Sequence, residues 1–115
     1  MKTNQTISAL SALAHDGRLA LFRLLVKAGP GGMPAGDLAK ATGAAFTTTS
    51  AQLSVLANAG LVTNRRAGRS VIYAADYDAI SAVFTYLLSD CCAGRPEIMQ
   101  NLVDLAASPT EREPQ

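Results

Sequence analysis

The chain has 115 residues, a length that allows one domain with one modest hydrophobic core and does not allow two. Hydrophobic residues make up 49% of the chain and aromatic residues only 5%, so we expect a core of Leu, Val, Ile and Ala, as in a small helical protein. No apolar run approaches the roughly 18 residues of a membrane span. The first residues carry no signal-peptide pattern, so we expect a cytoplasmic protein with no membrane partner.

The formal net charge of +1 hides a strong asymmetry along the chain. Residues 1–75 carry eight basic and two acidic side chains, a net charge of +6. Residues 76–115 carry two basic and seven acidic side chains, a net charge of −5. This separation predicts a basic working surface in the first part and a different role for the second.

The residue types leave little for enzymatic chemistry, because the chain has two cysteines, one histidine and no tryptophan. It contains no Gly-rich phosphate loop, no Ser-His-Asp set with local signatures and no zinc motif with four ligands. We therefore expect a protein that is not an enzyme and has no permanently bound cofactor.

Apolar residues at helical spacing predict two helices before the first glycine cluster. The first is expected at residues 6–14 and the second at about residues 16–28, with Asp16 as its N-cap. The second ends at residues 29–32, two glycines after a Gly-Pro pair, which cannot continue a helix. The expected apolar faces are Ile7, Leu10, Leu13 and Ala14 in the first helix, and Leu19, Phe22, Leu25 and Val26 in the second.

Two further helices are predicted at about residues 34–41 and 46–59. Pro34 is expected in the first turn of the shorter one, which ends at Gly43. Gly60 stands where the longer one needs a residue in the left-handed conformation. The residues expected to face inward are Leu38, Leu53, Leu56 and Ala57.

The periodicity then changes to that of strands and back again. Two β-prone runs, residues 61–66 and 70–74, flank residues 67–69 and predict a hairpin. A helical stripe follows, formed by Ile80, Val83, Phe84, Leu87, Leu88 and Cys91. A short helix is expected after Pro96, with Ile98, Leu102 and Leu105 on one face, before a polar end at residues 108–115.

This order of elements predicts a mainly α fold with a β-hairpin wing, a winged helix-turn-helix, at residues 1–92, followed by a partly disordered tail at residues 93–115. In such a fold the second helix of the motif enters the major groove of double-stranded DNA and the wing lies along the backbone or the minor groove. The alternative is an ordinary helix start beside a solvated hairpin. The predicted DNA-binding residues are Thr47, Thr48, Ser50, Gln52, Arg65, Arg66 and Arg69.

Three segments, residues 11–19, 50–62 and 65–73, resemble the ArsR/SmtB family of metal-responsive repressors, and the likeness extends over about residues 7–92. Its most specific part consists of Ala59, Gly60, Leu61 and Val62, followed by Gly68, Arg69 and Tyr73. The resemblance implies a homodimer, formed through the first and last helices, that represses its operator and is released by an inducer. The apolar stripes at residues 7–13 and 80–88 agree with a dimer, because they exceed what a chain of this size buries alone. The alternative is that both stripes pack onto the monomer's own core.

Cys91 and Cys92 are adjacent at the end of the last predicted helix. They are open to interpretation as small apolar residues, as a strained vicinal disulfide or as half of a zinc site for which His15 is the single histidine. A soft dithiol site is a further interpretation, because two thiolates suit a thiophilic ion of low coordination number such as trivalent arsenic or antimony.

The segment around these cysteines resembles one branch of ArsR repressors that sense arsenite there. Two features differ from the family: residues 34–37 hold no Cys-x-Cys pair, and residues 95–99 hold no third cysteine. Two thiolates per subunit suit methylated trivalent arsenic at least as well as arsenite with a non-protein ligand, and Met99 is expected to be an ordinary apolar residue. The predicted function is a repressor released by trivalent arsenic at Cys91 and Cys92. A thiol-redox-sensing repressor and a non-regulatory dithiol metalloid-binding protein are the alternatives.

Overall fold

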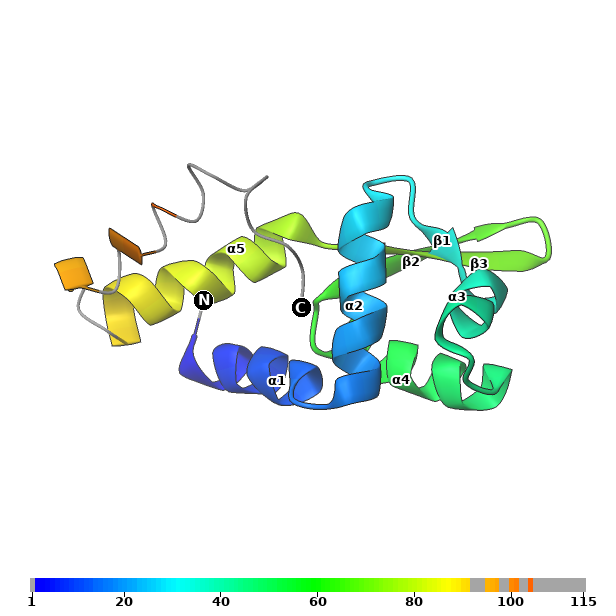
Figure 1. Ribbon diagram of the computed structural model, residues 1–115, viewed down its shortest axis with the longest axis horizontal. Helices are drawn as coiled ribbons and strands as arrows, with labels where there is room; N and C mark the ends of the chain where they lie inside the picture. Colours follow the sequence, from blue (N-terminus) through cyan, green and yellow to red (C-terminus); the bar gives the residue numbers. More distant parts are fainter. Residues whose placement is uncertain (1, 92–94, 98–99, 102–103, 105–115) are drawn as a thin grey trace.

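The computed structural model describes residues 2–91, 95–97, 100–101 and 104 (Figure 1). The helices and strands formed by these residues are α1 (Thr3–Leu13), α2 (Asp16–Ala28), β1 (Met33–Pro34), α3 (Ala35–Thr42), α4 (Phe46–Asn58), β2 (Val62–Ala67), β3 (Ser70–Ala75), α5 (Tyr77–Thr85) and the π-helix η1 (Tyr86–Cys91). The predicted class, mainly helical with a β-hairpin wing, is confirmed. None of the helices in the described part of the chain has the length and apolar character needed to cross a membrane.

Local hydrogen bonds determine where the first two helices begin. The α1 helix starts before the predicted residue 6, because the Lys2 backbone N–H donates to Gln5 Oε1 at 2.9 Å and caps the first turn. The prediction of Asp16 as N-cap of α2 was wrong, since His15 holds that position and Asp16 is the first helical residue. Both side chains accept from the Gly17 N–H, His15 Nδ1 at 3.1 Å and Asp16 Oδ1 at 2.9 Å.

The helix ends follow the sequence more closely. Gly43 has φ of 74° at the C-cap of α3, and Gly60, just beyond α4, has φ of 80°. The predicted helix end at Gly43 and the predicted left-handed conformation of Gly60 are therefore confirmed.

The sheet has three antiparallel strands in the order β1-β3-β2. The hairpin of β2 and β3 is confirmed, with Ala67 paired to Ser70 across a two-residue turn. Strand β1 was not predicted. It pairs with β3, with Met33 opposite Tyr73 and Pro34 opposite Ile72. Pro34 therefore precedes α3 as its N-cap instead of lying in the first turn. A proline fits here because β1 is an edge strand.

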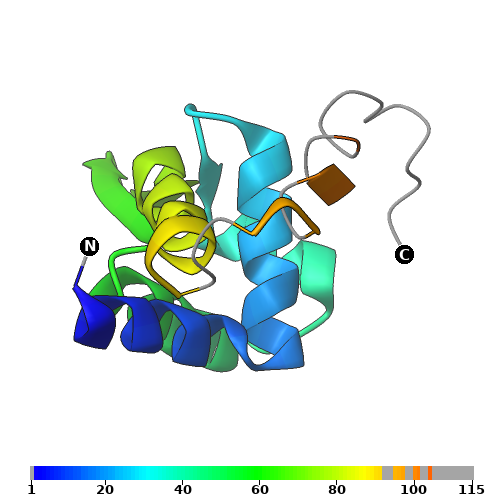
Figure 2. The ribbon, with the colours of Figure 1, turned by 90° about the vertical axis from the view of Figure 1, so that its left-hand side faces the viewer.

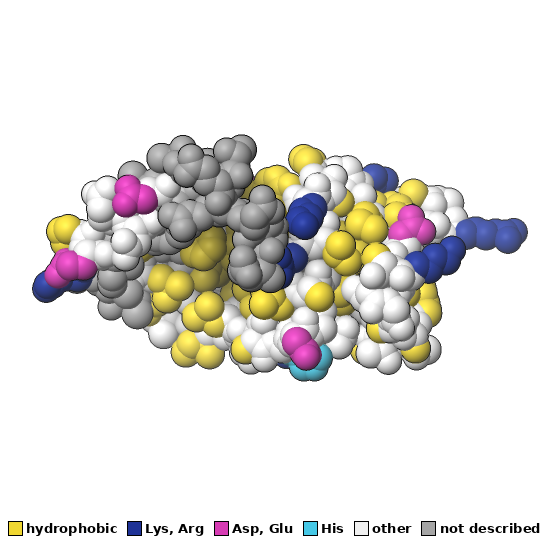
Figure 3. Space-filling model, viewed as in Figure 1, with side chains coloured by type: hydrophobic (Ala, Val, Ile, Leu, Met, Phe, Trp, Pro, Cys, Tyr) yellow, Lys and Arg dark blue, Asp and Glu magenta, His cyan; other side chains and the backbone are white. Residues whose placement is uncertain are grey.

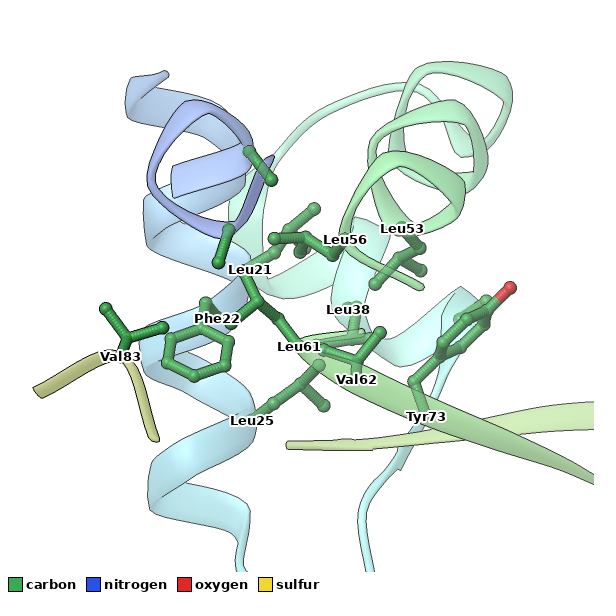
Figure 4. Close-up of a cluster of buried hydrophobic side chains, with 13 residues drawn as sticks. Leu21, Phe22, Leu25, Leu38, Leu53, Leu56, Leu61, Val62, Tyr73 and Val83 are labelled. Atoms are coloured by element: carbon green, nitrogen blue, oxygen red, sulfur yellow. The ribbon is translucent and has the colours of Figure 1, made fainter. Parts of the chain in front are cut away.

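The core lies where α2 crosses α3, α4 and the base of the wing (Figure 4). Its fully buried large side chains are Leu21, Leu25, Leu38, Leu53, Leu56, Leu61 and Val83. The predicted inward residues Leu38, Leu53 and Leu56 are among them, and the fourth, Ala57, is half-buried against this core. The core therefore fixes both helices of the motif relative to the sheet.

The last helix changes its geometry midway. Asp76 caps α5, and its Oδ1 accepts from the Ala79 N–H at 3.1 Å. From Tyr86 the chain continues as the π-helix η1, so the prediction of one uninterrupted α-helical stripe to Cys91 was wrong at its end. Viewed from the side of these elements, α5 lies above α1 with α2 beside them (Figure 2). Cys92, the face Ile98, Leu102 and Leu105, and the tail at residues 108–115 lie outside the described residues.

Candidate nucleic-acid interface and thiol site

The helix-turn-helix consists of α3 and α4, joined by residues 43–45. Leu38 anchors α3, while Leu53 and Leu56 anchor α4, and all three are fully buried. One face of α4 is thereby committed to the core, and the opposite face is left to solvent. This is the arrangement in which a recognition helix reaches a DNA groove.

The start of α4 carries no negative charge and no side-chain cap. Its N-cap is Ala45, whose side chain accepts no hydrogen bond, and its first turn holds no acidic residue. The positive end of the helix dipole is therefore open to an anion such as a phosphate. Thr47 and Thr48 are exposed in this first turn, and Ser50 is half-buried one turn further on. Their hydroxyl groups are of the kind that donate to phosphate oxygens.

Gln52 lies on the side of α4 that faces the start of α2, and it is half-buried. A Cβ added to Gly17 would lie 2.6 Å from Gln52 Nε2, so the amide of Gln52 lies close against the backbone at Gly17. Gln52 is thus packed against another element, unlike the freely exposed threonines. The predicted contact of Gln52 with DNA requires the amide to turn from Gly17 toward the groove.

The wing carries three exposed arginines in different settings. Arg65 and Arg66 are successive residues of β2, so their side chains point to opposite faces of the hairpin. Arg65 Nη2 donates to the Gly31 carbonyl at 3.2 Å, which ties it to the loop before β1. Arg69 lies in the turn, and dark-blue basic side chains project from the wing end of the molecule in Figure 3.

A cleft of about 280 Å³ lies between the helix-turn-helix and the wing. Ser50 and Arg69 both line this cleft, so the structure brings these two predicted residues together. Phe46 also lines it and was missed by the sequence interpretation, which looked only for polar groups on α4. The signal was present, because an aromatic residue stands directly before the threonine run.

A second surface, formed by α1, α2 and α5, is almost entirely apolar. It contains a groove of about 370 Å³ whose lining includes Leu10, Phe22 and Phe84, together with two basic residues, Arg23 and Lys27. Ile7 is 60% exposed, Leu10 39% and Phe84 55%. The predicted apolar stripes are therefore only partly covered by the chain's own core.

The thiol site is described only in part. Cys91 is the last residue of η1, and Cys92 lies outside the described residues. Within the described ranges no group of three or more His, Cys, Asp or Glu side chains is placed to hold a metal ion. His15 Nδ1 accepts a hydrogen bond from the Gly17 N–H at the start of α2. The exposed pair of Arg95 and Glu97 follows, joined at 2.8 Å, and the hydrogen bond from Arg95 lowers the pKa of the Glu97 carboxyl.

Residues 13–65 match the family of helix-turn-helix domains. Over 69 residues, 60% of the chain, the sequence is 46% identical to the HTH-type transcriptional regulator NmtR of Mycobacterium tuberculosis. That alignment covers 55% of NmtR, so the chain spans about half the length of this relative.

Two solved proteins are similar over most of their length. One is the fragment 1–100 of a possible ArsR-family transcriptional regulator from Mycobacterium bovis, solved by NMR as a homodimeric winged helix-turn-helix DNA-binding domain. The NMR structure is 26% identical in sequence, with a TM-score of 0.63, and the match covers 96% of this chain and 89% of the M. bovis chain. The crystal structure of the same fragment is 31% identical, with a TM-score of 0.61, and the match covers 80% of this chain and 94% of the M. bovis chain. The other is described as a possible transcriptional regulator for arsenical resistance, with 27% identity, a TM-score of 0.64 and coverage of 84% and 95%.

Proposed function

This chain belongs to the ArsR family of transcriptional regulators, and we propose that it binds operator DNA as a homodimer and represses transcription until trivalent arsenic or antimony binds Cys91 and Cys92. The observation that carries the proposal is the surface made by α4 and the wing. It combines an uncapped helix start without acidic residues with exposed arginines of the wing, of which Arg69 lines the same cleft as Ser50. Hydroxyl donors and arginines on one surface suit the phosphates and groove edges of duplex DNA.

The dimer is supported by the apolar surface of α1 and α5. Exposed Leu10 and Phe84 belong to one apolar face, and the hydration of this face costs free energy. A two-fold axis through this face would bury it and would set two copies of α4 one turn of DNA apart. The M. bovis relative is itself described as homodimeric.

The inducer part of the proposal rests on the position of Cys91. Cys91 is the last residue of η1, and Tyr86 is the first. The Tyr86 hydroxyl is hydrogen-bonded to the Thr3 hydroxyl of α1 at 2.8 Å, which links η1 to α1. A change at the end of η1 would therefore reach the dimer surface through α1. Two adjacent thiols bind a soft, low-coordinate metalloid when both are deprotonated, so binding should release protons. Methylated trivalent arsenic fits two sulfur ligands, and arsenite would add a non-protein ligand.

The test begins with a DNA duplex that the wild-type protein has selected from a random pool. It then measures how much of this duplex the protein releases when a metalloid is added. We expect arsenite, methylarsenite or antimonite to release the wild-type protein and to leave the double variant Cys91→Ser, Cys92→Ser bound. Equal affinity of both proteins for the duplex without metalloid is the control. Metalloid release of the serine variant would refute the site, and release by peroxide alone would favour a redox sensor. Absence of salt-dependent duplex binding would favour a dithiol metalloid-binding protein.

A further inference from the structure

Phe46 is an exposed aromatic residue at the start of the proposed recognition helix. It is the first residue of α4, and its side chain is 57% exposed. The core does not need it, since Thr49, Leu53 and Leu56 supply the buried face of this helix. Phe46 thus presents an aromatic ring to whatever approaches the end of α4.

The surroundings of Phe46 are apolar on the protein side and basic on the outer side. The cleft that it lines is formed by Pro34, Ala35 and Val71, with Arg69 contributed by the wing turn. The neighbouring residues of α4, Thr47 and Thr48, are exposed and uncharged. Phe46 is therefore an apolar contact point set among groups suited to phosphate.

We propose that Phe46 contacts the C5-methyl group of a thymine in the major groove. Phe46 would then help to determine which DNA sequences the protein prefers. The inference rests on the proposed function, because it requires α4 to enter the groove. The major groove offers one apolar group to a protein, and that group is the thymine methyl. A phenyl ring gains nothing from the other base edges, which present hydrogen-bond donors and acceptors.

The position of Phe46 in the helix supports this contact. N-terminal residues of a recognition helix are the ones that reach base edges. The uncapped amide groups at Ala45 and beyond would hold a phosphate at the rim of the groove, and Phe46 is adjacent to that point. The hydroxyls of Thr47 and Thr48 then complete a phosphate contact while the ring lies over the bases.

The size of the effect follows from burying one methyl group. Removing one methyl from the contact should weaken binding about fourfold for one half-site, and about 15-fold when both half-sites are changed. The effect is confined to one thymine per half-site, because a single ring reaches a single methyl group.

The experiment replaces thymine with deoxyuridine, which lacks only the methyl group. Duplexes are first selected by the wild-type protein from a random pool, and each thymine is then replaced in turn while affinity is followed by fluorescence anisotropy. We expect one symmetric position at which the replacement weakens wild-type binding about fourfold per half-site. For Phe46→Ala we expect equal affinity for thymine and deoxyuridine at that position, and for Phe46→Leu a reduced difference.

Tyr77→Ala is the matched control, since this exposed aromatic residue is the first of α5 and lines neither the cleft beside α4 nor the apolar groove. It should preserve the preference for thymine over deoxyuridine even if overall affinity falls. A wild-type protein indifferent to every replacement, or a Phe46→Ala protein that keeps the preference, would overturn the inference while leaving duplex binding intact. Failure to select any duplex would instead overturn the proposed function and this inference together.

Discussion

Gly32 occupies the point where the chain enters β1. Its φ is 73°, and a Cβ there would overlap the Tyr73 carbonyl of the neighbouring strand. Both the backbone conformation and the close approach therefore require glycine. Residues 29–32 were expected only to end a helix, and the requirement for pairing with β3 was not visible in their composition.

Replacing Gly32 with alanine should lower the free energy of unfolding by about 2 kcal/mol or more, because strain and overlap add. Gly43→Ala, with φ of 74° but open space around it, should cost about 1 kcal/mol. Gly31→Ala meets no neighbour within 4 Å and should be nearly neutral. Urea denaturation of the three variants measures this order. Equal losses at Gly43 and Gly32 would show that the close approach does not matter.

Sequence reasoning at the residue scale succeeded where one residue type answers one backbone need. The conformation of Gly60 was predicted because a left-handed C-terminal position favours glycine regardless of the rest of the fold. It failed where two side chains compete, as His15 and Asp16 do for the Gly17 N–H. It also left open the packing of Gln52 on Gly17, which depends on how α2 and α4 cross.

The wing is the element on which the proposed affinity for DNA depends most directly. Arg66 and Arg69 are exposed, whereas Arg65 is tied to the Gly31 carbonyl. Each arginine that neutralises a phosphate releases counterions, so affinity falls with salt in proportion to the number of such contacts.

We therefore expect Arg66→Ala and Arg69→Ala each to reduce the slope of log affinity against log salt by about 1 per subunit. Anisotropy titrations of a selected duplex at several salt concentrations provide the slopes. Arg95→Ala is the control, because this arginine lies in the acidic part of the chain and pairs with Glu97. An unchanged slope in both wing variants would remove the wing from the interface.

The helices and strands with strong local sequence signals were predicted, and those with weak signals were not. The β-prone runs of β2 and β3 around a turn and the apolar spacing of α4 identify these elements from sequence. Strand β1 has two residues and exists only because β3 offers a free edge. The π-turns of η1 also escaped prediction, since the spacing of its apolar residues fits an α-helix equally well.

At the scale of the molecule, the charge asymmetry corresponds to a division of surfaces. The basic part of the chain contributes α4 and the wing, and the acidic part begins with Asp76 at the start of α5. The apolar surface of α1 and α5 lies at the other end of the molecule from the wing (Figure 1). A dimer formed there leaves both basic surfaces free, so near-neutral total charge is compatible with a nucleic-acid partner.

The dimer surface yields the last prediction. Leu10→Glu or Phe84→Glu would bury a carboxylate in a largely apolar interface, where the basic side chains of the groove, Arg23 and Lys27, offset only part of a desolvation cost of several kcal/mol. We expect the dimer dissociation constant to rise at least about 100-fold, as measured by sedimentation equilibrium. Duplex affinity should fall with it, because a monomer contacts one half-site and about half of the phosphates. Ala41→Glu, which adds the same charge to an exposed position of α3, should remain dimeric. Dimers that persist in both interface variants would place the two-fold axis elsewhere on the molecule.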